Sequence, residues 1–138
     1  MFASNARTMT EFDVRRLDAL FERIRTQVKP PSTLSVLERE LAQAVVVSPE
    51  HVPAGVVTMN SQVEVVDLET DERRSLTVVF PSMASIEVGR ISVLAPLGTA
   101  LIGSREGAHV AWQTPRGLRQ LQVRRVVYQP EASGRFDL

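Results

Sequence analysis

The sequence predicts an α+β protein: a short N-terminal antiparallel helical hairpin of the coiled-coil type, followed by a strongly bent antiparallel β-sheet wrapped on one short helix. Three observations support this fold class. Apolar residues recur at helical spacing over residues 12–44, alternate as in strands through much of residues 56–128, and change period in the middle of Gly89–Gly103. The change of pattern near Ser48 and Pro49 predicts two domains, spanning residues 1–47 and 48–138.

The first helix is predicted to begin near Thr10 and to run for about 15 residues. Thr10–Asp13 has the composition of a capping signal. Pro30 and Pro31 end the helical pattern, because proline lacks the backbone N–H that a helix needs. The apolar stripe of this helix consists of Phe12, Leu17, Leu20, Phe21, Ile24 and Val28.

The second helix is predicted to begin between Ser32 and Ser35. Ser35 and Glu38 have the spacing of a capping box. Because only a few residues separate the two helices, they should form an antiparallel hairpin. Isolated helices of this length are marginal in water, so their apolar stripes must pack on each other or on the second domain. The second stripe consists of Leu34, Leu37, Leu41 and Ala44.

The remainder of the chain is predicted to form the sheet. Polar segments at residues 69–72 and 114–117 should be the turns of two β-hairpins. Within two of the expected strands the apolar positions switch from one face to the other, which a β-bulge or a strong bend would produce. The expected strands lie at residues 56–59, 62–68, 75–80, 108–113 and 118–128.

The segment Gly89–Gly103 predicts a strand, a tight turn and a short buried helix. Its apolar residues alternate before Pro96 and recur at helical spacing after it, and proline is a favourable first residue of a helix. Gly98 should allow close packing of the helix on the sheet, and Gly103 should end the helix in the left-handed conformation.

Several classes of active site are not expected. The chain has no cysteine, which excludes disulfides, thiolate metal sites and cysteine nucleophiles. His51 and His109 are the only histidines, and no serine lies in a recognisable nucleophile motif. Gly98–Gly103 lacks the lysine of a phosphate-binding loop, because Ser104 and Arg105 follow it. We therefore expect no catalytic residue, no metal or other cofactor, and no small-molecule substrate.

The charge pattern argues against general capture of nucleic acid. The chain has 16 basic and 16 acidic residues, and we expect no direct sequence-specific contact with nucleic acid. Acidic residues gather in residues 62–72 and arginines in residues 110–129, which either polarises the surface or reflects ordinary solvated strand faces. No window approaches the roughly 18 apolar residues of a membrane span, and the polar N-terminus does not look like a secretion signal, so a cytoplasmic protein is expected.

Four segments of the chain resemble the bacterial regulators of nucleoside diphosphate kinase, a branch of the Gre transcript-cleavage factor family. These segments are residues 57–61, 91–103, 115–117 and 128–132. The resemblance extends from about Val46 to Gly134, whereas over the first helices it rests mainly on length and order. It implies an FKBP-like C-terminal domain behind an N-terminal antiparallel coiled coil.

The resemblance implies a particular activity, which one segment of this sequence contradicts. Gre factors place their coiled coil in the secondary channel of RNA polymerase, where acids at its tip help to hold a magnesium ion for cleavage of backtracked RNA. In this chain the corresponding tip, Gln27–Thr33, has no acid and contains the only lysine, Lys29. Since magnesium prefers oxygen ligands, we expect no cleavage activity. The nearest acids, Glu22 and Glu38, lie more than a helical turn from the bend.

The protein is therefore expected to be a non-catalytic transcription regulator, not an enzyme, that binds RNA polymerase near the secondary channel. It would influence transcription elongation and contact DNA only indirectly. We expect a monomer, although the apolar stripes of the hairpin could also support a dimer.

The resemblance also indicates which residues could contact the polymerase. Candidates at the exposed edge of the second domain are Ser92, Pro96, Leu97 and Leu101, and candidates at the hairpin tip are Lys29, Pro30 and Pro31. Each has an alternative role. The first group could serve only in turn formation and core packing, and the second could simply end one helix and turn the chain.

The alternative function is that of an FKBP-type peptidyl-prolyl isomerase. Such an enzyme needs an apolar pocket lined by several aromatic residues. The second domain offers Phe80, Trp112 and Tyr128 near its expected core, and some of these must fill the core itself.

Overall fold

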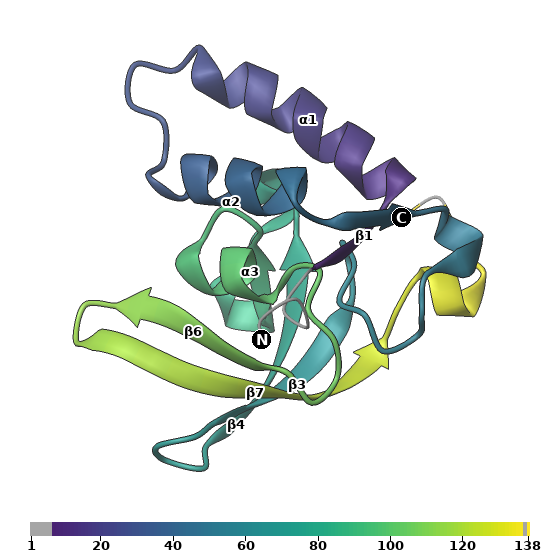
Figure 1. Cartoon of the computed structure of the whole chain (residues 1–138). Coiled ribbons are helices and arrows are strands. Elements are labelled where there is room, and N and C mark those ends of the chain that lie inside the picture. The colour runs from purple at the N-terminus through teal and green to yellow at the C-terminus, as the bar shows by residue number, and fades with distance from the viewer. Residues whose placement is uncertain (1–6, 137) are drawn as a thin grey trace.

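The computed structural model describes residues 7–136 and residue 138. Figure 1 shows the helices on one side of a curled sheet. This sheet has five strands in the order β5, β4, β3, β7, β6. The chain therefore has a mixed α+β fold. The helices are α1 (Glu11–Arg25), α2 (Thr33–Ala42) and α3 (Pro96–Leu101); the strands are β1 (Thr8–Thr10), β2 (Val45–Val47), β3 (Gln62–Asp67), β4 (Arg73–Val79), β5 (Arg90–Ser92), β6 (His109–Thr114) and β7 (Gly117–Tyr128).

The sheet contains both predicted hairpins, β3 with β4 and β6 with β7, and a central antiparallel pairing of β3 with β7. The edge strand β5 instead runs parallel to β4. The prediction of an antiparallel sheet was wrong for this strand. The chain leaves β4 through two short 3₁₀ turns, η3 (Pro81–Met83) and η4 (Ile86–Val88), and so enters β5 in the same direction as β4.

A second, two-stranded sheet was not predicted. β1 comes directly before α1 in the sequence and β2 follows α2, and the two strands pair in parallel. The backbone N–H of Thr8 also donates to the carbonyl of Gly103 at 3.0 Å. The N-terminal strand is thereby attached to the end of α3. The strand predicted at residues 56–59 does not form. Val56 makes an isolated bridge with Arg105, and the N–H of Val57 donates to the carbonyl of Ser104.

The side-chain cap predicted for the start of α1 forms, whereas the one predicted for α2 does not. Thr10 caps α1 as predicted, since its Oγ1 accepts from the N–H of Asp13 at 3.0 Å. The helix ends at Arg25, before the prolines, and leaves Val28 fully exposed. The capping box predicted for α2 does not form. Glu38 instead makes an ion pair with Arg25 of α1.

The turn and helix predicted within Gly89–Gly103 are confirmed. Pro96 is the first residue of α3, and Gly103 adopts the left-handed conformation with φ +79°. At Gly98 an added Cβ would lie only 2.1 Å from the carbonyl oxygen of Ser92. Close contact between α3 and the preceding turn therefore requires glycine at this position.

The predicted irregularity in the long strands is also confirmed. The pairing of β3 with β7 changes register twice, and the unpaired extra residues are Arg124 and Val127 on β7. These two bulges allow the apolar positions of β7 to switch face and increase the bend of the sheet.

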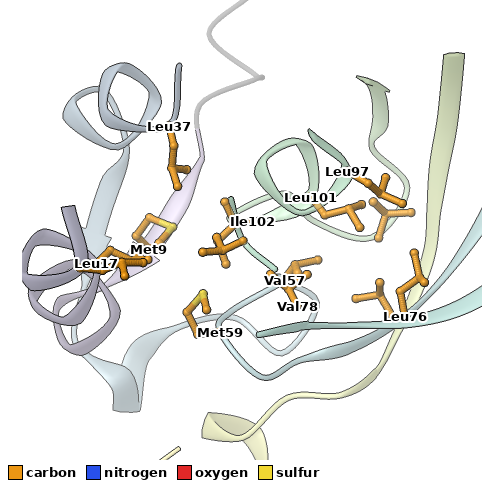
Figure 2. Close-up of a cluster of buried hydrophobic side chains, with 14 of the residues drawn as sticks. Met9, Leu17, Leu37, Val57, Met59, Leu76, Val78, Leu97, Leu101 and Ile102 are labelled. Carbon is orange, nitrogen blue, oxygen red and sulfur yellow. The ribbon is translucent and has the colours of Figure 1, made fainter. Parts of the chain in front are cut away.

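One hydrophobic core joins residues from both sides of the predicted domain boundary. In Figure 2, Leu17 of α1 and Leu37 lie near Met9 at one end of this core, and Leu97 and Leu101 of α3 lie at the other.

Among the described residues no helix is both long and apolar enough to cross a membrane.

Candidate functional site

The tip loop, residues 26–32, connects α1 to α2 and exposes all three predicted tip residues, Lys29, Pro30 and Pro31. Glu22 is exposed on α1, whereas Glu38 is engaged with Arg25. Nowhere in the described chain do three or more histidine, cysteine or carboxylate side chains gather as a metal site would require. The loop therefore presents a positive charge and two proline rings.

The predicted docking residues differ in their exposure. Pro96 is exposed at the start of α3, and Ser92 is half-buried with its Oγ accepting from the N–H of Leu94 at 3.0 Å. Leu97 is only 6% exposed and Leu101 is fully buried. Of the four residues, only Pro96 presents a largely exposed side chain for direct contact.

A hydrogen bond connects the start of α2, directly after the tip loop, to the turn before α3. The hydroxyl of Thr33, the first residue of α2, donates to the carbonyl of Leu94. This contact holds the end of the tip loop beside the turn that leads to Pro96. The two predicted contact regions, which are more than sixty residues apart in the sequence, are therefore attached to each other.

A cavity of about 430 Å³ lies beside Leu97, between α3 and the strands of the sheet. It was not predicted, because its walls come from segments that the pairing of β7 with β3 and β6 brings together. Its apolar residues are Val65, Leu97, Trp112, Pro115 and Leu121, and its polar residues are Asp67, Thr70, Glu72, Arg74, Thr114, Arg116 and Arg119. Trp112 is the single aromatic residue among them, whereas a prolyl isomerase pocket needs several.

The cavity is lined by an ion pair and by a residue whose hydrogen-bond donor has no acceptor in the described chain. Arg119 donates to Asp67 at 2.6 Å. The backbone N–H of Glu69, which is the largest cause, and Arg119 hold the pKa of Asp67 below its usual range. The Nε1–H of Trp112 is buried and has no hydrogen-bond acceptor within residues 7–136 and 138. Trp112, which lines the cavity, therefore carries a buried donor without an acceptor.

Ion pairs connect the acidic and basic segments noted in the sequence. β3 and β7 are neighbours, and their side chains form cross-strand pairs between Asp67 and Arg119 and, at 3.2 Å, between Glu64 and Arg124. The arrangement matches ordinary strand faces with paired charges rather than a polarised surface.

A buried polar cluster attaches α1 to the region of the sheet. Asp13 is fully buried, its Oδ1 accepts from Arg16 at 2.6 Å, and its Oδ2 accepts from the backbone N–H of Met59 at 3.0 Å. Glu131, in the last 3₁₀ turn, accepts from Thr58 at 2.7 Å. Burial raises the pKa of both carboxyl groups. This cluster was not predicted from the sequence.

Known proteins resemble this chain along most of its length. The family described as transcription elongation factor, GreA/GreB, C-terminal part, matches residues 52–128. The regulator of nucleoside diphosphate kinase of Escherichia coli strain K12 is 37% identical over 131 residues, which cover 94% of this chain and 95% of that protein. Transcription elongation factor GreA of Vibrio parahaemolyticus is 42% identical over 74 residues, 54% of this chain and 47% of its own length.

A solved structure extends the likeness to three dimensions. The GreA/GreB elongation factor from Nitrosomonas europaea superposes with a TM-score of 0.74 at 36% identity, covering 88% of this chain and 99% of that one. The family match, the nearly full-length relative and this structure agree. The chain therefore belongs to the GreA/GreB family of transcription elongation factors.

Proposed function

We propose that this protein is a non-catalytic regulator that binds RNA polymerase near the secondary channel. The observation that carries the proposal is the tip loop without carboxylates in a member of the GreA/GreB family. A cleavage factor needs oxygen ligands for magnesium at its tip, and this tip presents Lys29, Pro30 and Pro31 instead.

The proposed docking surface consists of Pro96 and the cavity beside Leu97. Pro96 supplies an exposed apolar contact, Leu97 forms one wall of the cavity, and Trp112 supplies a donor without an internal acceptor. Ser92 and Leu101 act by shaping the turn and packing α3. In this proposal the sheet and α3 correspond to the FKBP-like domain, residues 48–138, of a cytoplasmic monomer.

The two N-terminal helices are proposed to act as a short coiled-coil hairpin at the channel entrance. The bond from Thr33 to Leu94 holds the start of α2, next to the tip loop, beside the turn that leads to Pro96, so the tip loop and the docking surface could contact the polymerase together. The protein would then compete with longer coiled-coil factors without supplying a catalytic magnesium site.

Binding to core RNA polymerase tests the proposal. We expect a complex at micromolar concentrations, weakened by Pro96→Ala and unaffected by Pro53→Ala, since both prolines are exposed but only Pro96 lies on the proposed surface. No complex at these concentrations would refute the proposal. In stalled elongation complexes we expect no magnesium-dependent shortening of the transcript; shortening would show that the protein is a cleavage factor.

A further inference from the structure

An open groove of about 540 Å³ lies between α1 and the 3₁₀ turn that follows β4. It shares no residue with the cavity beside Leu97. Ala19, Leu20 and Arg23 line it from α1, and Phe80 and Met83 line it from the opposite side. Because the residues from α1 are three and four positions apart, they form one continuous wall.

The floor of the groove is apolar and accessible. Leu20 is buried beneath it, Phe80 is half-buried, and Met83 is 55% exposed. Ala19 is exposed and has the smallest side chain that a helix wall can present without glycine, so it leaves room above Leu20. A methionine in such a wall can adapt its shape to an incoming side chain.

The rim of the groove is positively charged. Arg16 and Arg23 lie two helical turns apart on the same face of α1, and none of the lining residues is acidic. Arg16 is committed within the fold: it donates to Asp13, and its guanidinium lies 4.8 Å from the centre of the Phe80 ring. Arg23 makes no ion pair with any described residue and so remains open to a carboxylate.

We propose that this groove binds a segment of a partner protein in which a large apolar side chain is flanked by carboxylates. The apolar side chain enters between Ala19 and Met83 and covers Leu20 and Phe80. A flanking carboxylate pairs with Arg23. This surface is separate from the polymerase-docking surface, and the inference does not depend on polymerase binding.

A titration of the isotope-labelled full chain by nuclear magnetic resonance tests the proposal. The probe is a short synthetic peptide with one phenylalanine flanked on both sides by glutamates. We expect saturable shifts of the amides of Ala19, Leu20 and Ser82 and of the Met83 methyl group, with a dissociation constant of about 1 mM or tighter. A lysine-flanked version of the same peptide should bind at least about tenfold more weakly, because Arg23 would repel it.

Matched variants locate the site. Arg23→Glu should weaken binding of the glutamate peptide about fivefold to tenfold, whereas Arg15→Glu, an exposed arginine on α1 outside the groove, should change it little. Ala19→Phe should fill the groove and abolish the shifts. The proposal is overturned if no saturable shift reaches these residues, if both arginine variants behave alike, or if the shifts follow protein concentration without peptide, which would identify a second copy of the chain as the occupant.

Discussion

The carboxylate of Asp13 accepts a hydrogen bond from the backbone N–H of Met59 at 3.0 Å, and this bond connects the first turn of α1 to the loop before β3. Asp13 is fully buried and its other oxygen accepts from Arg16. A single side chain therefore caps a backbone donor 46 residues away and neutralises an arginine at the edge of the core. Both functions depend on the two side-chain oxygen atoms.

Removal of this carboxylate should strongly destabilise the fold. Asp13→Ala leaves the Met59 N–H without its acceptor and removes the carboxylate partner of Arg16, which keeps only its bond to the carbonyl of Leu138. The free energy of unfolding should fall by about 3 kcal/mol. Urea denaturation measures the loss. Asp18→Ala is the matched control, because Asp18 is an exposed acid on the same helix and should cost about 0.5 kcal/mol or less. Equal losses for the two variants would show that the buried bonds contribute nothing specific.

Glu131 should make stability depend on pH in the direction opposite to an ordinary ion-paired acid. Burial raises the pKa of Glu131, with a further contribution from the negative charge of Asp13, while the bond from Thr58 acts in the opposite direction. The folded chain then binds this proton more tightly than the unfolded chain. The free energy of unfolding contributed by Glu131 is therefore fully present below its unfolded pKa of about 4.3 and is lost as pH rises through its higher folded pKa.

The variant Glu131→Gln isolates this effect, because its amide oxygen can still accept from Thr58. We expect the stability difference between Glu131→Gln and the wild type to grow in favour of the variant between about pH 4 and pH 7. Denaturation curves at several pH values measure the difference. Glu87→Gln, at an exposed position, should follow the wild type throughout. A constant difference for Glu131→Gln would mean that this group does not titrate differently on folding.

Gly98→Ala should damage the fold although alanine favours helices. The added Cβ would lie 2.1 Å from the carbonyl oxygen of Ser92 and 3.0 Å from the Cα of Val93, and both of these atoms belong to the backbone. The turn before α3 must therefore move, at a cost of about 3 kcal/mol or more in unfolding free energy.

Gly55→Ala provides the comparison for Gly98→Ala in thermal unfolding. Its nearest neighbour would be the flexible side chain of Glu106, at 3.1 Å, so a loss below about 1 kcal/mol is expected. A normal melting temperature for Gly98→Ala would contradict the close packing of α3 on the turn.

Local chemistry made part of the fold predictable. Pro96, Gly98 and Gly103 specify the start, the close packing and the end of α3, and each requirement acts within a few residues. The parallel pairings of β1 with β2 and of β5 with β4 were not predicted. β1, β2 and β5 have three residues each, and the direction of each pairing depends on how distant segments pack, which no local pattern shows.

The candidate sites show the same division between local and distant effects. Asp13 could have been identified, because it lies four and seven positions before Leu17 and Leu20 and so places an acid on the buried face of α1. Trp112 and the pair of Asp67 with Arg119 could not have been identified as parts of one site, since the cavity exists only after β7 pairs with both β3 and β6.

Trp112→Phe should separate the structural role of this residue from its proposed role in binding. Phenylalanine keeps most of the apolar surface beside Leu97 but removes an N–H that has no acceptor in the described chain. The free energy of unfolding should therefore stay constant or rise by up to about 1 kcal/mol. If the N–H donates to polymerase, the affinity for core polymerase should fall about tenfold at the same time, since a typical hydrogen bond contributes roughly this factor. Denaturation and binding measured on one preparation distinguish the two roles, and unchanged affinity would remove Trp112 from the proposed docking surface.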